Sequence, residues 1–453
     1  MLSSVNLQVL HVDNSYFIVV FSNRTKAFIR VDPKTRVDAF TLKKNIKRSS
    51  EVMMNCSVDD FMQYVEEEDI KFIRLLFCDI FGTPKNISVM SGDLRRAFNS
   101  GVGINPMGIP GFSREQCSDL FLHPLTDNAA VLPWRPDQGR VVRLFCDIRH
   151  QDETPFACDT RNILKIAVNK AKADGIEFTF GTRIEFYLFK TDEDGEPTVV
   201  PFDKAGYMDI APLDKGENVR REICLTLERM GITPFNSHHE AGPGQNEIDF
   251  VSADPIKAAD DMITYMTVVK TIAARNGLFA DFSPKPLADQ PGNGFHVNFT
   301  ARRGDDNSVQ LNAIAGIMDK ICDITLFMNR CEESYRRIGK DEAPRYVTWS
   351  GGNYGQLIRV PATKGHHYAQ LRSPDAFSNP YLIFALIIEA GLYGIRNGLE
   401  PDNPVNEDLK VTGDPEGRYR LLPGTIEEAK KAARGSAFLK EVLPPSIIEA
   451  YCD

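Results

Sequence analysis

The segment His238-His-Glu-Ala-Gly-Pro-Gly-Gln-Asn-Glu247 places two carboxylates, Glu240 and Glu247, on either side of a turn. The turn is predicted from Gly242-Pro-Gly244, because glycine and proline favour a fixed bend over a helix or a free strand. Two acids held across a rigid turn suit a hard divalent cation such as Mg²⁺ or Mn²⁺, which prefers oxygen ligands in fixed geometry. The alternative interpretation is a solvated acidic turn, and other motifs decide between the two.

Three further segments place polar residues in apolar surroundings. The first, Gly181-Thr-Arg-Ile-Glu-Phe-Tyr-Leu-Phe189, predicts a buried strand interrupted by Glu185, and a buried carboxylate is costly unless it is paired or bound to metal. The second, Gly292-Asn-Gly-Phe-His-Val-Asn298, places His296 in a short strand behind two glycines. The third is Asn379-Pro-Tyr-Leu, which follows Leu371-Arg-Ser-Pro-Asp375. Each segment taken singly favours a structural role.

In this order and spacing, the segments resemble the glutamine synthetase family, type I. The resemblance runs from about Val65 to the C-terminus. It also includes the segments Ile70–Asn86, Leu132-Pro-Trp-Arg-Pro136, Ser334-Tyr-Arg-Arg337, Glu342-Ala-Pro344 and Gln356-Leu-Ile-Arg-Val-Pro361. The family implies an α+β fold, with an N-terminal β-grasp domain and a large catalytic α/β domain that contains a curved antiparallel sheet. We therefore expect a β-grasp domain over residues 53–153 and a catalytic domain over residues 154–453.

Residues 1–52 precede the resemblance and form a separate β-rich extension in our prediction. Short strands are expected at Tyr16–Phe21, Ala27–Val31 and Arg36–Thr41, with turn signals between them. A competing interpretation is a misassigned translation start, because the family-like part begins near Met53 or Met54.

Elsewhere, helical spacing predicts helices at 58–67, 161–173, 256–276, 309–331 and 380–397, with Asp159 or Thr160 as the cap of the second. Strands are expected at 70–78 and 140–147. The apolar run that begins at Tyr381 is broken by Glu389 and predicts a buried helix.

Composition narrows the classes of function. The chain has 453 residues, of which 42% are apolar and 25% charged, as in ordinary globular proteins. A net charge of −9 disfavours a nucleic-acid partner, because the summed field repels phosphate backbones. No apolar run approaches the ~20 residues of a membrane span, and no signal peptide is evident, so no membrane partner is expected. Nine scattered cysteines without Cys-x-x-Cys pairs are typical of a reduced, cytoplasmic protein.

The family resemblance assigns roles to individual residues. Glu185, Glu240 and Glu247 match a first metal site for Mg²⁺ or Mn²⁺. His296 matches a ligand of the second metal, which binds the phosphates of the substrate ATP, and His296, Asn298 and Arg359 are expected near the nucleotide. Arg337 and Arg372 match arginines that grip the substrate carboxylate and nascent phosphate, and Arg359 matches a phosphate contact. Glu342 matches the flap glutamate that shields the intermediate and takes a proton from the amine.

The departures from the family pattern concentrate on charged positions. Arg183 replaces the first acid of Glu-x-Glu-Phe, and Gln370 replaces the acid of Arg-x-Glu-x-Arg. Tyr354 stands where the family has a phosphate-binding arginine, and Asn105 where it has an aspartate that helps to hold ammonium. A second metal flanked by a guanidinium and without both carboxylates should bind poorly. Only His296 remains of that second site.

Two interpretations of function follow from these departures. In the first, the chain is an ATP-dependent carboxylate–amine ligase of the glutamate–ammonia type that forms a γ-glutamyl phosphate. Its substrates are glutamate or an analogue, ATP, and ammonium or another amine, with altered amine choice or reduced activity. In the second, it is a non-catalytic paralogue that binds a ligand or co-assembles with an active synthetase. The resemblance also implies a homo-oligomer, a double-ring dodecamer with sites between neighbouring subunits.

Overall fold

The computed structural model describes residues 6–12, 15–22, 25–31, 52–53, 56–112, 118–304, 306–361, 368–414 and 416–453. The chain divides into two compact units, residues 1–51 and residues 52–453. In the first unit, β1 (Asn6–Val12), β2 (Ser15–Ser22) and β3 (Thr25–Val31) form an antiparallel sheet in sequence order. The predicted strands at 16–21 and 27–31 are confirmed, and β1 was not expected. The predicted strand at 36–41 lies outside the described residues.

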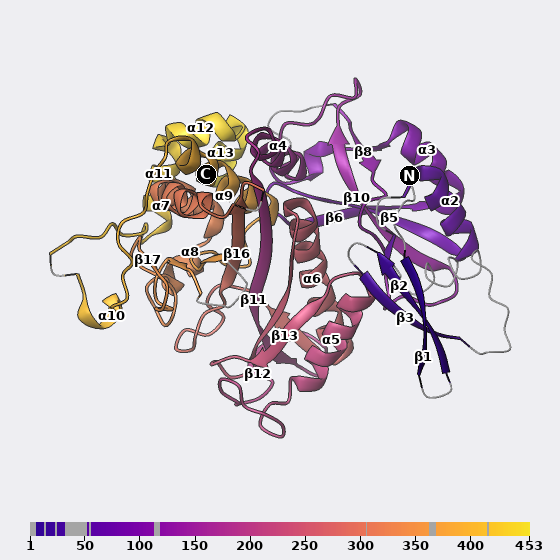
Figure 1. Ribbon diagram of the computed structural model, residues 1–453, viewed down its shortest axis with the longest axis horizontal. Helices are drawn as coiled ribbons and strands as arrows, with labels where there is room; N and C mark the ends of the chain where they lie inside the picture. The colour runs from indigo at the N-terminus through magenta and orange to yellow at the C-terminus, as the bar shows by residue number, and fades with distance from the viewer. Residues whose placement is uncertain are drawn as a thin grey trace. The chain divides into compact units, whose positions relative to one another are not determined.

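The second unit begins with a β-grasp domain (Figure 1). Its sheet has the order β4-β9-β10-β5-β6, with β8 beside β10 and β7 beside β8. The central pair, β5 and β10, is parallel, whereas the other pairs are antiparallel. The strands are β4 (Val52–Met53), β5 (Ile70–Cys78), β6 (Pro84–Met90), β7 (Val102–Ile104), β8 (Leu120–Pro124), β9 (Ala129–Val131) and β10 (Arg140–Arg149).

Helix α2 (Val58–Glu67) illustrates how sequence determines the local structure of this domain. Its Ser57 side chain caps the helix by accepting a hydrogen bond from the Asp60 backbone N–H at 3.1 Å. Phe61 and Val65, one turn apart, are buried. Helix α3 (Leu94–Ser100) likewise buries Leu94 and Ala97.

The catalytic domain is built on a mostly antiparallel sheet of order β13-β14-β11-β16-β19-β18-β17, with β12 and β15 also paired to β11. Strand β11 is the longest and pairs with β12, β14, β15 and β16 (Figure 1). The strands are β11 (Glu177–Thr191), β12 (Pro197–Pro201), β13 (Pro234–His239), β14 (Gln245–Ala253), β15 (Leu278–Asp281), β16 (Phe295–Arg302), β17 (Trp349–Ser350), β18 (Ile358–Arg359) and β19 (Ala369–Leu371).

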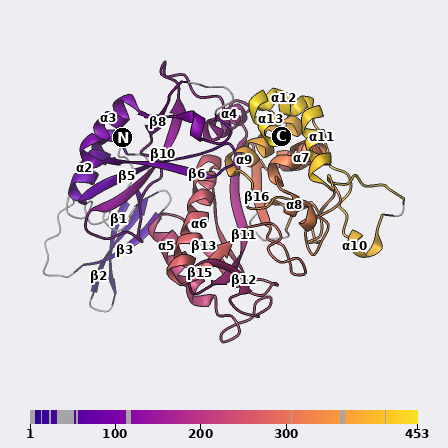
Figure 2. The same cartoon turned by 180° about the vertical axis from the view of Figure 1, so that it is seen from behind.

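Helices pack on this sheet and on one another. Helix α6 contacts β11 and β14, α7 contacts β16, and α4 contacts α9. In both cartoon views the C-terminal helices gather beside β16 (Figures 1 and 2). The helices of this domain are α4 (Thr160–Ala173), α5 (Glu217–Arg229), α6 (Pro255–Arg275), α7 (Val309–Met328), α8 (Glu332–Arg337), α9 (Pro380–Arg396), α10 (Leu409–Thr412), α11 (Ile426–Gly435), α12 (Ala437–Val442) and α13 (Pro445–Cys452).

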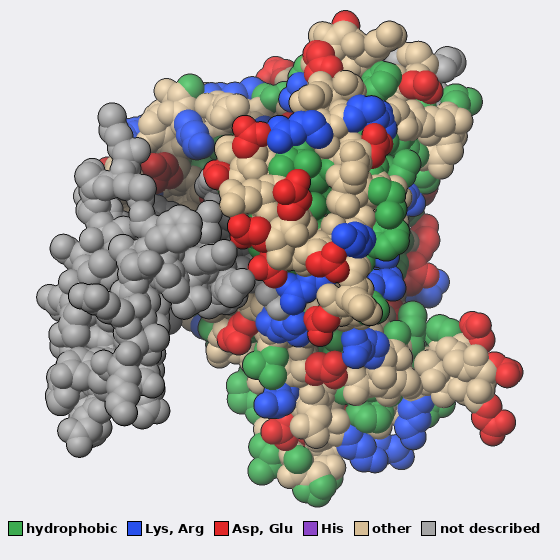
Figure 3. Space-filling model, turned by 90° about the vertical axis from the view of Figure 1, so that its right-hand side faces the viewer, with side chains coloured by type: hydrophobic (Ala, Val, Ile, Leu, Met, Phe, Trp, Pro, Cys, Tyr) green, Lys and Arg blue, Asp and Glu red, His purple; other side chains and the backbone are tan. Residues whose placement is uncertain are grey.

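The predicted long helices are confirmed within a few residues, and Asp159 is the cap of α4. Helix α7 ends at Met328 rather than at 331, because the backbone of Asn329 leaves the helical conformation, with φ −148° and ψ 76°. The predicted buried helix is α9, in which Glu389 is ion-paired with Lys170 at 2.6 Å. No helix in the described part of the chain has both the length and the apolar character needed to cross a membrane. Acidic and basic side chains are interspersed over the face shown in Figure 3.

Candidate active site

The register of the large sheet gathers polar residues on one face. Glu185 on β11 lies opposite Glu247 on β14, which lies opposite His238 on β13. Arg183 lies opposite His296 on β16. Since alternate residues of a strand project to the same side, Glu185 and Arg183 share a face. The short strands β19 and β18 extend this face, because Asn298 lies opposite Gln370, and Gln370 opposite Arg359.

A cavity of about 560 Å³ opens on this face. Seven of the residues assigned to the site from sequence line the cavity, as do the substituted positions Arg183 and Tyr354. Those seven residues are Glu185, Glu240, Glu247, His296, Arg337, Glu342 and Arg372. Asn298 and Arg359 are not among the lining residues, and Asn105 belongs to the β-grasp domain, where it caps a short turn through Met107.

Glu185 is held by donors at the starts of the two strands that flank β11, β14 and β16. Its Oε2 accepts hydrogen bonds from the Gly294 backbone N–H at 2.8 Å and from Gln245 Nε2 at 3.1 Å. Burial and, after it, the neighbouring Glu240 raise the pKa of Glu185 to about 7, and the hydrogen bond from the Gly294 N–H opposes the rise. A Cβ at Gly294 would lie 2.8 Å from His296 Nε2. Glycine at this position therefore lets the carboxylate and the imidazole approach the same space.

Glu247 lines the cavity and is also paired with Arg183. Its Oε1 accepts a hydrogen bond from Arg183 Nη2 at 2.7 Å. Burial and the neighbouring Asp249 raise the pKa of Glu247 well above its usual value, and Arg183 counteracts them. Asp249 accepts from Arg183 Nε at 3.0 Å, so the guanidinium is fixed between two buried carboxylates. The sequence analysis did not assign Asp249, although it stands two residues after Glu247 and so projects to the same face.

Glu240 stands at the start of the predicted turn, and its Oε1 lies 2.9 Å from His238 Nε2. The turn itself is confirmed, since Glu240 N–H donates to the Gln245 carbonyl at 2.8 Å and Gln245 N–H to the Gly242 carbonyl at 3.0 Å. His238 was quoted in the sequence motif without a role. Its position two residues before Glu240 in β13 is the signal that could have found it.

A second layer of hydrogen bonds fixes this turn from below. Asp203 accepts from the Gly244 backbone N–H at 3.0 Å and from the His239 ring at 2.9 Å. The other ring nitrogen of His239 lies 2.7 Å from the Glu240 carbonyl oxygen. Asp203, Asp214 and His239 are close enough to resemble a metal-binding group. Asp214 is engaged by Arg220 at 2.6 Å, so we interpret the group as structural.

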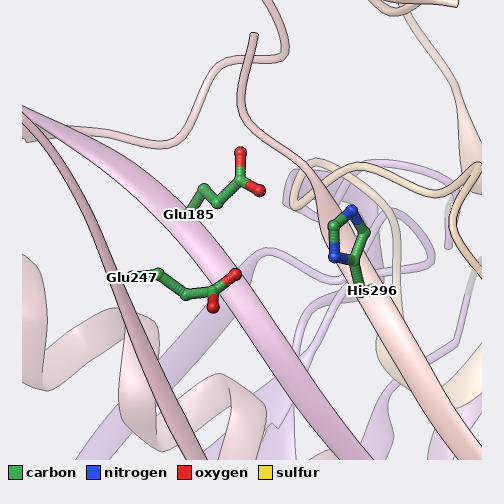
Figure 4. Close-up of side chains that lie close together, drawn as sticks. All are labelled: Glu185, Glu247 and His296. Atoms are coloured by element: carbon green, nitrogen blue, oxygen red, sulfur yellow. The ribbon is translucent and has the colours of Figure 1, made fainter. Parts of the chain in front are cut away.

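His296 faces a positively charged wall. Burial lowers the pKa of His296 well below its usual value, and the charges of Arg372, Arg183 and Arg337 lower it further. The imidazole is therefore neutral, which is the form that binds a metal. Figure 4 shows the His296 ring and the Glu185 and Glu247 carboxylates converging from three strands.

The candidate ligand atoms form two overlapping groups. Those of Glu185, Glu247 and His296 lie within 4.8 Å of one another, and so do those of His238, Glu240 and Glu247. The expected set of Glu185, Glu240 and Glu247 thus spans both groups, with Glu247 in common. Carboxylate oxygens suit Mg²⁺ or Mn²⁺, whereas an imidazole favours Mn²⁺ over Mg²⁺.

Two buried arginines form the opposite wall. Arg337, at the end of α8, donates to the backbone carbonyls of Ser373 and Pro374. Arg372 donates to Gln370 at 2.8 Å and to Glu342 at 2.9 Å, although the Glu342 side chain is 72% exposed. The buried Nε atoms of both arginines have no hydrogen-bond partner among the described residues.

Arg359 and Asn298 do not line the cavity, but each contacts a residue of the site. The Arg359 guanidinium lies over the Tyr354 ring, 3.8 Å from its centre, and the ring lines the cavity. Asn298 Oδ1 accepts from Gln370 Nε2 at 3.0 Å. Tyr354 therefore separates Arg359 from the acid-lined part of the cavity.

Comparison with known proteins agrees with this geometry. The catalytic domain of glutamine synthetase matches residues 157–453, and the glutamine synthetase β-grasp domain matches residues 69–151. A glutamine synthetase of Clostridium saccharobutylicum is 39% identical over 416 residues, which covers 88% of this chain and 94% of the relative. That of Staphylococcus aureus (strain MW2) is 40% identical over 411 residues, covering 87% and 92%.

Solved structures are similar as well. The structure described as "GmaS/ADP complex-Conformation 1" is 25% identical, with a TM-score of 0.78 over 86% of this chain and 93% of its own. The cryo-EM structure of Plasmodium falciparum glutamine synthetase has a TM-score of 0.78 at 19% identity, over 88% and 95%. The second comparison supports the fold alone.

Proposed function

Because this chain belongs to the glutamine synthetase family, we propose that it is an ATP-dependent carboxylate–amine ligase of the glutamine synthetase type. The observation that supports the proposal most directly is the shared cavity. Three carboxylates that suit a divalent cation and two buried arginines that suit an acid face the same space of about 560 Å³.

The proposed reaction has two steps. The carboxylate of glutamate or an analogue attacks the γ-phosphorus of ATP, so that an acyl phosphate forms and ADP leaves. The amine nitrogen then attacks the acyl carbon, phosphate leaves, and the nitrogen loses a proton as the amide forms. Catalysis of such transfers depends mainly on positioning and charge neutralisation.

One divalent cation fits the residues present. Glu185, Glu240 and Glu247 would hold it, and Mg²⁺ or Mn²⁺ would neutralise the phosphoryl oxygens during transfer. The raised pKa values of Glu185 and Glu247 indicate crowded carboxylates that a cation would relieve. A second cation does not fit, because Gln370 and Arg183 stand where the family has acids.

Arg337 and Arg372 are proposed to hold the acid substrate, since both are buried arginines that line the cavity. Glu342 is proposed to take the proton from the amine. Its exposed carboxylate is anchored to Arg372 at the cavity wall, and it can reach a nitrogen arriving from solvent.

For the amine, we propose a substrate other than ammonium. Asn105 is neutral where the family has an ammonium-binding aspartate, and a neutral amide attracts a small cation weakly.

A specific observation favours the alternative, a non-catalytic paralogue. Arg183 pairs with Glu247 at 2.7 Å, and a guanidinium cannot bridge two phosphates as a metal ion does. Such a protein would bind an acidic ligand or co-assemble with an active synthetase.

Calorimetric titration of the purified protein with Mn²⁺ and then ATP, followed by an ADP-release assay, tests both candidates. The assay contains glutamate and either ammonium or a series of primary amines. Amine-dependent ADP release supports the ligase. One bound metal without ATP binding, and no ADP release with any amine, would favour the non-catalytic protein.

A further inference from the structure

We propose that Arg183 binds a phosphate group in the cavity through the outer edge of its guanidinium, formed by Nη1 and Nη2. The inference deepens the proposed function and rests on it for its biological meaning, because phosphate is the group that the ligase transfers. The binding itself can be measured without turnover.

Hydrogen bonds to two carboxylates fix the orientation of the Arg183 guanidinium. Nε donates to Asp249 at 3.0 Å and Nη2 donates to Glu247 at 2.7 Å. These two nitrogens form one edge of the planar group, so the carboxylates occupy that edge. The adjacent edge, made by Nη1 and the second proton of Nη2, keeps the fork geometry that matches two phosphate oxygens. Nη1 has no hydrogen-bond partner among the described residues.

Arg183 is also placed where a ligand can reach it. Its side chain is 24% exposed and lines the cavity. The two carboxylates that hold it are 3% and 1% exposed, so the tether is buried while the outer edge is accessible. This arrangement fixes the guanidinium before a ligand arrives, which lowers the entropy cost of binding.

Two further arginines reinforce the positive charge of Arg183 on this side of the cavity. Arg183 lies opposite His296 in the sheet, and the charges of Arg183, Arg337 and Arg372 all act on that imidazole. The acids Glu185, Glu240, Glu247 and Asp249 oppose an anion, and a divalent cation bound to the first three would offset much of that opposition. Phosphate binding is therefore expected in the presence of Mg²⁺.

Gln370 removes a carboxylate ligand that a second metal ion would need. Both ends of its amide are occupied, the oxygen by Arg372 at 2.8 Å and the nitrogen by Asn298 at 3.0 Å. The position thus offers a neutral amide oxygen that already accepts a hydrogen bond, and no negative charge for a cation. The permanent charge of Arg183 takes over the role of neutralising the phosphate.

The test is calorimetric titration of inorganic phosphate into the full chain at saturating Mg²⁺. We compare wild type, Arg183→Gln, Arg183→Lys and a control, Arg302→Gln, which changes an exposed arginine at the far end of β16. Replacing the fork should weaken phosphate binding by about tenfold or more in Arg183→Gln, and by less in Arg183→Lys, which keeps the charge. Arg302→Gln should match wild type.

Circular dichroism and thermal melting establish that each variant is folded, and Arg183→Lys serves if Arg183→Gln is not. Equal phosphate affinity in wild type and in the folded Arg183 variants would overturn the inference. So would two Mg²⁺ ions bound per wild-type chain, or no phosphate binding by wild type. Phosphate binding that depends on Arg183, without ligase activity toward any amine, would refute the proposed function and leave this inference intact.

Discussion

The side-chain carbonyl of Gln370 accepts a hydrogen bond from Arg372 Nη1 at 2.8 Å. A carboxylate at this position would carry a charge available to a metal ion, whereas the amide is neutral and joined to Asn298 at its other end. Arg372 in turn contacts Glu342 at 2.9 Å. The substitution has thus converted a predicted metal-ligand position into part of a polar chain that leads to the cavity wall.

We predict that Arg183→Glu combined with Gln370→Glu restores a second metal. The pair removes a permanent positive charge and adds two carboxylates beside His296, so two Mn²⁺ ions should bind per chain. Calorimetric stoichiometry measures this, and Gln370→Glu alone should leave it at one, because Arg183 still repels a cation. A second ion in Gln370→Glu alone would contradict this account.

Glu240→Gln should weaken Mn²⁺ binding by about tenfold or more, because it removes a charged oxygen ligand. The measurement is calorimetric titration of Mn²⁺, with Glu193→Gln as a matched change at an exposed turn between β11 and β12. Unchanged affinity in Glu240→Gln would mean that the acids form only a solvated cluster.

Protonation of Asp261 should make stability depend on pH. Burial raises the pKa of Asp261 from 3.8 to about 6, while Lys257 opposes the rise. Between these values the folded chain holds a proton that the unfolded chain has lost, so stability falls as pH rises through the window. Above pH 6 this loss of folding stability is complete and amounts to about 3 kcal/mol. The melting temperature of Asp261→Asn relative to wild type should therefore rise from pH 4 to pH 6.5. A relative fall would show that Lys257 dominates.

A homo-oligomer is expected from the family, and light scattering on the purified protein measures its mass. We predict a dodecamer in which the β-grasp domain of one subunit covers the cavity of the next. Asn105 supports such sharing, since it lies in the β-grasp domain and does not line the cavity of its own chain. A stable monomer would refute the assembly.

Much of the fold could be predicted because local sequence and tertiary structure agree. The apolar run around Glu185 predicts β11, and helical spacing over residues 58–67 predicts α2, for which the structure adds Ser57 as the cap. Strand β1 was missed, although Leu7-Gln-Val-Leu10 has partly alternating character. The turn at Gly242-Pro-Gly244 was predicted correctly because those residues permit few conformations.

The candidate site was less predictable, because charge pairing depends on register between distant strands. That Arg183 pairs with Asp249 follows only from the alignment of β11 with β14. The stacking of Arg359 on Tyr354 depends on a loop whose path no local pattern determines. Family resemblance supplied the candidate residues, and the structure adds which partners hold each of them.

Wild-type protein should form little or no glutamine from glutamate, ammonium and ATP at neutral pH. The reason is that the second cation position holds a guanidinium, and Tyr354 and Asn105 remove two further charges that the family uses. Restoring metal alone should not restore activity, because residues that act as one unit are not additive. We expect activity only when Tyr354→Arg and Asn105→Asp accompany Arg183→Glu and Gln370→Glu. Product analysis by chromatography separates glutamine from ADP released by hydrolysis. Robust wild-type synthesis would show that one metal and the Arg183 charge suffice for the transfer of phosphate in this chain.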